Sequence, residues 1–201
     1  MTELHIGVLG IQGACSRHAE ILSSAGVPAV MVKYREQLRE IDGLIIPGGE
    51  STTMTKMMDF RIGYDDIREY GKDHPIFGTC AGLIMLGRGC NDPRVRQLGF
   101  LDAGNLRNAY GSQKESFIEE ISLTFDPDKS FHAVFIRAPQ IESTGKSVRV
   151  LARYEHKPVL IESGIHLGAS FHPELTADTR IHRYFIQKVK EIKNEKTTRR
   201  T

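Results

Sequence analysis

Short apolar runs, each bounded by glycine or proline, recur through the first half of the chain. Four of them are typical of buried strands, at residues 4–10, 28–33, 43–49 and 75–79. Segments with helical spacing lie between and after them, at 14–25, 51–60, 64–72 and 80–87. Strands that alternate with helices pair in parallel, so the pattern predicts a three-layer α/β fold: a mostly parallel central sheet with helices on both faces.

The second half of the chain is richer in strand-like segments. Five runs have this character, and several of them alternate apolar with polar residues: SFIEEISLTF, HAVFIRAP, SVRVLARY, PVLIES and GIHLGASF. They are compatible with an extension of the main sheet or with a smaller antiparallel one. An amphipathic helix is expected at 176–193, which makes 1–193 one domain and leaves 194–201 as a frayed basic tail.

Composition and charge narrow the class of protein. The 201 residues are 40% hydrophobic and 26% charged, as in ordinary globular domains, and no apolar run reaches the roughly 20 residues that span a bilayer. The formal charge of +2 is carried by the tail, so no nucleic-acid partner is expected. Three cysteines without a C-x-x-C pair argue against disulfides or zinc and favour the cytoplasm.

The segment GTCAG, where the fourth strand meets the next helix, has the form of a nucleophile elbow with cysteine in place of serine. Gly78 and Gly82 would let neighbouring backbone approach closely, and a helix N-terminus at Cys80 would favour an anion. A free thiol has a pKa of about 8.5 and is only a few per cent ionised at neutral pH, so it needs a base. A buried cysteine in a tight turn would give the same pattern.

The segment GASFHPELT supplies a candidate base, His172. Residues i and i+2 of an extended segment point to the same side, so Glu174 can orient the imidazole and stabilise its charged form. The order Cys80, His172, Glu174 disfavours an α/β-hydrolase, whose acid precedes its histidine. The remaining histidines are expected to be structural or superficial, among them His18, His166 and His182.

The segment PGGES supplies candidate donors for an oxyanion. The backbone N–H groups of Gly48 and Gly49 can turn towards the reacting carbonyl, and the N–H of Ala81 is a natural second donor. One such donor contributes about 10²–10³ in rate. A plain turn with Ser51 capping the next helix is compatible with the same residues.

The segments PGGEST, FGTCAGLI and FHPELT resemble class I glutamine amidotransferases in their order and spacing. IGVLGIQG, RNAYGSQKESF and FIRAP resemble, more narrowly, the glutaminase subunits of pyridoxal 5′-phosphate synthase, and the resemblance covers nearly the whole chain before the last helix. It implies a flavodoxin-like fold, no cofactor, and hydrolysis of L-glutamine to L-glutamate and ammonia. Cys80 would form a thioester, His172 would relay protons and Glu174 would orient His172.

The resemblance also implies substrate contacts and a partner. The glutamine site would comprise Gly49, Glu50, Ser51, Arg107, Ile136 and Arg137, with Gln12 behind the oxyanion site. The partner would be a TIM-barrel synthase subunit that builds the vitamin B6 ring. Ammonia would reach it through a channel, in a complex of twelve synthase and twelve glutaminase subunits.

Three other functions remain to be weighed against this one. The chain could serve another amidotransferase complex, such as imidazole glycerol phosphate synthase, although RNAYGSQ and IRAP argue against it. It could instead be a non-catalytic, amidotransferase-like binding module, for which a missing triad residue would be expected. A redox or chaperone protein with a reactive cysteine would not need the His-x-Glu arrangement.

Overall fold

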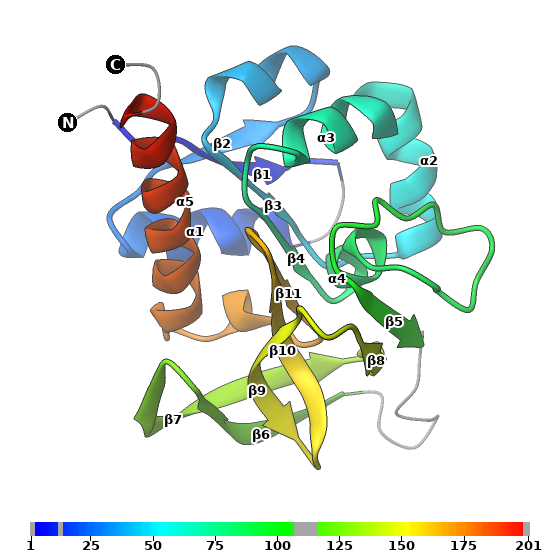
Figure 1. Cartoon of the computed structure of the whole chain (residues 1–201), viewed down its shortest axis with the longest axis vertical. Coiled ribbons are helices and arrows are strands. Elements are labelled where there is room, and N and C mark those ends of the chain that lie inside the picture. The colour runs from blue at the N-terminus through cyan, green and yellow to red at the C-terminus, as the bar shows by residue number, and fades with distance from the viewer. Residues whose placement is uncertain (1–2, 12–13, 107–115, 199–201) are drawn as a thin grey trace.

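A seven-stranded sheet forms the centre of the molecule, with the strands in the order β2-β1-β3-β4-β11-β10-β9 (Figure 1). This computed structural model describes residues 3–11, 14–106 and 116–198. Neighbours from β2 to β11 pair in parallel, and β10 and β9 complete the sheet in antiparallel pairing. The strands are β1 Ile6–Leu9, β2 Ala29–Val32, β3 Gly43–Ile46, β4 Ile76–Thr79, β9 Arg149–Tyr154, β10 Lys157–Ser163 and β11 His166–Ala169.

Helices cover both faces of this sheet, which confirms the predicted three-layer α/β fold (Figure 1). On β3 the side chains of Leu44 and Ile46 join one core cluster and that of Ile45 joins the other, as the period of two in a strand requires. The first cluster packs under α2 Ser51–Arg61, α3 Tyr64–Gly71 and α4 Ala81–Leu86. The second packs under α1 Cys15–Ser24 and α5 Arg180–Thr198.

The strand-rich second half follows both of the predicted possibilities. β9, β10 and β11 extend the main sheet, whereas two antiparallel ribbons stand apart from it: β5 Ala103–Leu106 with β8 Gln140–Thr144, and β6 Ser116–Leu123 with β7 Asp126–Ile136. The β6–β7 ribbon packs onto the second core cluster, where the rings of Phe135 and Phe171 lie 5.6 Å apart. It therefore abuts the chain immediately before His172.

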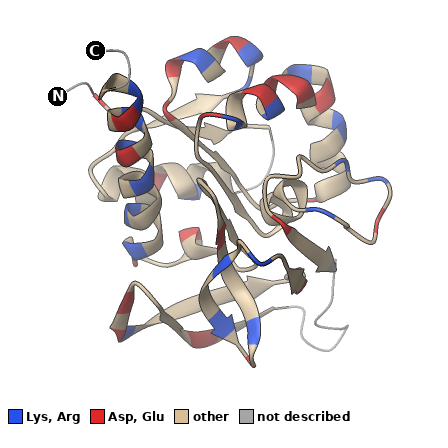
Figure 2. Ribbon diagram, in the orientation of Figure 1, with Lys and Arg blue, Asp and Glu red and all other residues tan. Residues whose placement is uncertain are grey.

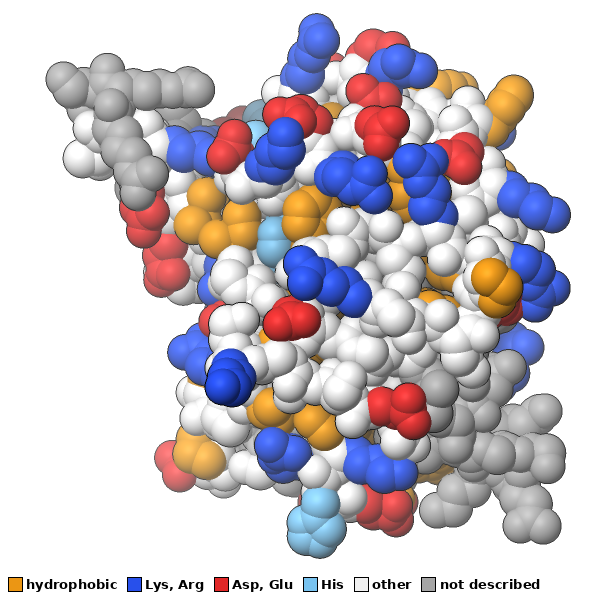
Figure 3. Space-filling view, turned by 45° about the vertical axis from the view of Figure 1, so that its right-hand side comes forward, with side chains coloured by type: hydrophobic (Ala, Val, Ile, Leu, Met, Phe, Trp, Pro, Cys, Tyr) orange, Lys and Arg blue, Asp and Glu red, His pale blue; other side chains and the backbone are white. Residues whose placement is uncertain are grey.

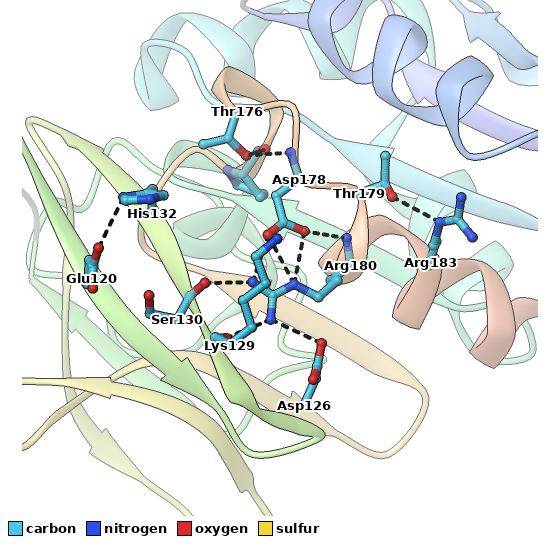
Figure 4. Close-up of polar contacts among 11 residues, drawn as sticks. Glu120, Asp126, Lys129, Ser130, His132, Thr176, Asp178, Thr179, Arg180 and Arg183 are labelled. Carbon is cyan, nitrogen blue, oxygen red and sulfur yellow. Dashed lines mark hydrogen bonds and ion pairs between the residues drawn. The ribbon is translucent and has the colours of Figure 1, made fainter.

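Arg180, the first residue of α5, links the last helix to the β7 strand by hydrogen bonds (Figure 4). Its Nη1 donates to Asp126 Oδ2 at 3.0 Å and to Lys129 O at 2.7 Å. Its Nη2 donates to Ser130 O and Asp178 Oδ2, both at 2.7 Å. Since β7 and the segment before α5 both lead into the site described below, this guanidinium fixes their relative position.

The last helix differs from its predicted bounds at both ends. It begins at Arg180 and not at 176, because Pro173–Leu175 form a short 3-10 helix, η2. It continues to Thr198, where the composition led us to expect a frayed end from residue 194. Lys193 Nζ donates to Asp42 Oδ2 at 2.8 Å and Lys196 Nζ lies 3.0 Å from His74 Nε2, so contacts with distant residues hold the final turns.

Another short 3-10 helix, η1 Arg35–Glu40, was not predicted from the sequence. Acidic and basic residues are mixed along the helices (Figure 2) and over the face shown in Figure 3. Within 3–11, 14–106 and 116–198, no helix is long and apolar enough to cross a membrane. On the face shown in Figure 3 the charges do not gather at one place; in a parallel sheet the carboxyl ends of the strands are where sites usually lie.

His166 on β11 is a buried histidine with a structural environment. Its Nδ1 accepts the N–H of Ile76 at 3.3 Å, and its ring stacks on Phe100 with centroids 4.4 Å apart. Burial, with a smaller effect from the charge of Lys188, lowers the pKa of His166 to about 4. Between about pH 4 and 6.5 the ring is therefore neutral in the native state, whereas the same histidine is protonated in the unfolded chain.

This difference predicts a loss of stability in acid. The unfolded chain binds the His166 proton below pH 6.5 and the native chain only near pH 4, so the free energy of unfolding falls as the pH decreases between these values. His166→Asn keeps an acceptor for the Ile76 N–H but does not titrate. Urea titrations should show the wild-type advantage over the variant shrinking by about 3 kcal/mol from pH 6.5 to 4. A pH-independent difference would contradict the shift.

Candidate active site

Cys80 lies in the tight turn between β4 and α4 and has a strained backbone. Its φ of 50° and ψ of −106° place a non-glycine residue at positive φ, a conformation that costs about 1–3 kcal/mol. The Cys80 N–H donates to Ala169 O on β11 at 2.8 Å, and Cys80 O accepts the N–H of Ile84 at 3.3 Å. Hydrogen bonds to a neighbouring strand and to α4 thus hold the elbow that the GTCAG segment predicted.

The two glycines of the elbow sit where no side chain fits. A Cβ on Gly82 would lie 2.0 Å from Ile46 O, and one on Gly78 would lie 2.5 Å from Gly82 O. Both contacts are with backbone, which cannot move aside. The close crossing of β3, β4 and α4 therefore requires glycine at both positions, as the sequence indicated.

His172 and Glu174 form a buried pair beside the elbow. His172 Nδ1 lies 2.7 Å from Glu174 Oε1, and the two side chains are 10% and 0% exposed. The His172 N–H donates to Val134 O on β7 at 2.8 Å, which fixes the backbone of this segment. The expected side-by-side placement of residues i and i+2 is present.

The charges in this pair support each other. Burial opposes a charge on His172, but its bonds with Cys80 and Glu174 prevail and raise the pKa of His172 to about 10. Burial likewise raises the pKa of Glu174, but the neighbouring His18 and His172 lower it below its usual value. At neutral pH an imidazolium therefore lies between the cysteine and an ionised carboxylate, ready to donate a proton.

A cavity of about 390 Å³ opens in front of Cys80. Most of the residues proposed from the sequence line it: Gly48, Gly49, Glu50, Ser51, Cys80, Ala81, Ile136, Arg137 and His172. Glu174 stands behind His172, whereas Gln12 and Arg107 lie outside the described residues. Ala14, Ile84 and Leu175 also line the cavity, and no signal in the sequence distinguished them.

The end of β7 forms the wall of the cavity opposite the elbow. Cys80 Sγ lies 3.8 Å from Ile136 O, and Arg137 has a φ of 42°. This left-handed backbone turns the chain sharply after Ile136. The cavity is therefore bounded by strained residues on two sides, Cys80 and Arg137.

Glu50 begins α2 as its N-cap, so the interpretation of Ser51 as the cap is wrong. The Glu50 carboxylate accepts the N–H groups of Thr52 and Thr53 at 3.1 and 2.7 Å. It also accepts both threonine hydroxyls, and hydrogen bonding, that of Thr52 foremost, lowers the pKa of Glu50 to about 2. A carboxylate engaged in this way can contribute to the cavity through its backbone more readily than through its oxygens.

Gly48 lies against the side chains of His172 and Cys80, with no room for a side chain of its own. A Cβ at this position would lie 2.4 Å from His172 Cε1 and 3.2 Å from Cys80 Cβ. Only glycine leaves the imidazole in place here. The backbone of Gly48 therefore lies against the imidazole and beside Cys80, and the roles of Gly48 and Ala81 as oxyanion donors stay predictions.

In the described part of the chain, no group of three or more His, Cys, Asp or Glu side chains is placed to hold a metal ion. The chemistry of the cavity is that of a nucleophile and an acid–base pair. On this parallel α/β sheet, the combination is that of a class I glutamine amidotransferase.

Comparison with known proteins agrees with this class. Residues 8–191 match the model of the SNO glutamine amidotransferase family. The chain is 47% identical over 192 residues to "Pyridoxal 5′-phosphate synthase subunit PdxT" of Brevibacillus brevis, covering 95% of this chain and all of that protein. The Solibacter usitatus protein of the same name is 46% identical over 189 residues, covering 92% and 98%. The chain belongs to the SNO glutamine amidotransferase family.

Solved structures show the same relationship. A structure described as "Crystal structure of glutamine amidotransferase" has a TM-score of 0.86 and 43% identity, covering 92% of this chain and 98% of that one. A putative GMP synthase protein from Thermoplasma acidophilum has a TM-score of 0.70 at 18% identity, covering 98% and 99%. The second likeness shows the fold alone.

Gly48→Ala tests the close packing around the nucleophile. The added methyl group would displace His172, so glutamate release from L-glutamine should fall by about 100-fold or more, with the circular dichroism spectrum unchanged. Gly10→Ala is the matched control, because its Cβ would meet only the flexible side chains of Met31 and Lys33, at 3.2 and 3.4 Å. Near-wild-type activity in Gly48→Ala would contradict the geometry.

Proposed function

We propose that this chain is the glutaminase subunit of a pyridoxal 5′-phosphate synthase, which hydrolyses L-glutamine and supplies the ammonia to a synthase subunit. The observation that carries the chemistry is the 2.7 Å contact of His172 with the buried Glu174, beside Cys80 at the mouth of a cavity. The names of the relatives, at 45–47% identity over nearly their whole length, support the pathway.

Glutamine binds in the cavity with its side-chain amide at Cys80. The guanidinium groups of Arg107 and Arg137 are suited to the substrate α-carboxylate, since arginine forms paired hydrogen bonds with carboxylates. Backbone groups of Gly49, Glu50, Ser51 and Ile136 complete the site around the amine and amide. Gln12 is assigned a supporting role at the oxyanion site on the resemblance alone.

The first half of the reaction releases ammonia. The Cys80 sulfur, having given its proton to His172, attacks the amide carbon to form a C–S bond, and the carbonyl oxygen becomes an oxyanion facing the N–H groups of Gly48 and Ala81. The oxyanion collapses and the C–N bond breaks as His172 gives its proton to the nitrogen. Ammonia leaves, and a γ-glutamyl thioester remains on the enzyme with a neutral His172.

The second half regenerates the enzyme. His172 takes a proton from water, and the hydroxide attacks the thioester carbon to give a second oxyanion. Collapse breaks the C–S bond and returns the sulfur as a thiolate beside the imidazolium. The product leaves as glutamate after its new carboxyl group loses a proton to solvent. Glu174 holds the imidazole in one tautomer through both halves.

The partner is a TIM-barrel synthase subunit that receives ammonia through a channel, in a complex of twelve copies of each subunit in the cytoplasm. The relatives' names support the partner, because each is a subunit of pyridoxal 5′-phosphate synthase. The likeness to the putative GMP synthase structure, at 18% identity, concerns the fold and gives no support to another pathway.

Cys80→Ala separates this function from its alternatives. Glutamate release by the wild type should rise when the pyridoxal phosphate synthase subunit is added, and the variant should stay at background in both conditions because it lacks the nucleophile. Cys90→Ala, which changes a cysteine outside the cavity, should behave as the wild type.

Two outcomes would contradict the proposal. Turnover that survives in Cys80→Ala would show that Cys80 is not the nucleophile. Equal stimulation of glutamate release by the cyclase subunit of imidazole glycerol phosphate synthase would contradict the assignment to pyridoxal 5′-phosphate synthesis.

A further inference from the structure

The Glu174 carboxylate uses only one of its two oxygens in the His172 pair. Oε1 faces His172, whereas Oε2 is fully buried and has no hydrogen bond of standard geometry. The group that faces Oε2 is His18 Nε2, at 3.4 Å. A buried carboxylate oxygen without a donor is costly, so the hydrogen on this imidazole matters to the site.

His18 projects from α1 into the space between β4, η2 and α5 and is completely buried. Its Nε2 is also 3.2 Å from Thr79 Oγ1, and its Nδ1 is 3.0 Å from Nε2 of the buried His182. Thr79 immediately precedes the nucleophile. The sequence suggested only a structural role for both histidines, which lie 164 residues apart along the chain.

The position of the protons follows from the polar atoms that have no partner. If His18 carries its hydrogen on Nε2, the hydrogen points to Glu174 Oε2 and Thr79 Oγ1, and Nδ1 accepts from His182 Nε2. His182 Nδ1, which has no partner, is then a bare acceptor. The opposite tautomer would leave a buried N–H of His182 without an acceptor and turn a lone pair of His18 towards the carboxylate. The first arrangement is therefore favoured.

We propose that His18 is a positioning residue of the triad: its Nε2–H shares Glu174 Oε2, directs Oε1 to His172, and is kept on Nε2 by His182. The inference rests on the proposed glutaminase function. Glu174 is thereby held from two sides, by the histidine that reacts and by one that does not. His182 acts one step further away, by fixing the tautomer of His18.

His18 performs this role as an uncharged ring. Burial lowers its pKa despite the opposing charge of Glu174, and burial holds the pKa of His182 well below the ordinary value. The groups that face the ring are Glu174, His182 and Thr79, with His172 beyond the carboxylate. A neutral donor leaves the negative charge of Glu174 available to His172, whereas a cation at this position would compete for it.

A pair of amide variants separates the two ring nitrogens. The side-chain amide of His18→Gln reaches the depth of Nε2 and keeps a donor for Glu174, but loses the contact with His182. That of His18→Asn reaches only the depth of Nδ1 and loses the donor. We expect His18→Asn to lower kcat by about 10-fold or more with KM little changed, and His18→Gln to stay within about 3-fold of the wild type.

Three further readouts exclude a merely structural effect. The acid limb of the pH–rate profile should move to higher pH in His18→Asn alone, because Glu174 loses a donor that stabilises its charged form. His18→Asn added to Glu174→Gln should cause little further loss, since both act on the same contact. The low-field proton signal of His172 Nδ1–H in the NMR spectrum should persist in His18→Gln and broaden in His18→Asn.

Several results would overturn the inference. They are equal losses of kcat in the two amide variants in step with their melting temperatures, additive losses with Glu174→Gln, or an NMR signal unchanged in both. If His18→Asn does not fold, His182→Leu takes its place. It should lower kcat by less than the 10-fold or so expected of His18→Asn, and it should weaken the same NMR signal. No change in kcat or in the signal would refute the role. A wild type without Cys80-dependent turnover would instead refute the proposed function, while the NMR signal still tests the contact.

Discussion

The buried carboxylate of Glu174 is the constraint on which the site depends. A charge removed from water must be paired or hydrogen-bonded, and two histidines from separate parts of the chain face this one: the charged His172 two residues before it and the neutral His18 on the first helix. The fold meets this demand by packing α1 next to η2 and to the end of β4, where His18 reaches both Glu174 and Thr79. Cys80 then lies beside the imidazole that the carboxylate holds, so the three residues proposed as nucleophile, base and orienting acid are positioned together.

Much of the fold could be predicted from the sequence because its signals are local. Apolar runs bounded by glycine gave the parallel strands, and the small residues around Cys80 indicated a turn in which side chains have no room, as the contacts of Gly82 with Ile46 O bear out. The spacing of His172 and Glu174 needs only an extended segment to bring them together. In each case a few neighbouring residues carry the whole signal.

The features that were missed depend on distant contacts. The final turns of α5 are held by Asp42 and His74, and the pairing of His18 with His182 joins the two ends of the chain, so neither is visible in a local pattern. Ser51 was a reasonable cap by residue type, but the longer side chain of Glu50 reaches the same N–H groups. Tertiary packing determines these features, and a local pattern of residue types carries no information about such packing.

In the proposed mechanism, Cys80 carries the glutamyl group between the release of ammonia and the attack of water. The most direct test is an acid quench of the complex during turnover of isotopically labelled glutamine, followed by mass spectrometry of the peptides. We predict a labelled γ-glutamyl thioester on the peptide that contains Cys80, and none in Cys80→Ala. Label on another residue, or turnover without label at Cys80 when water attack is made limiting, would contradict the mechanism.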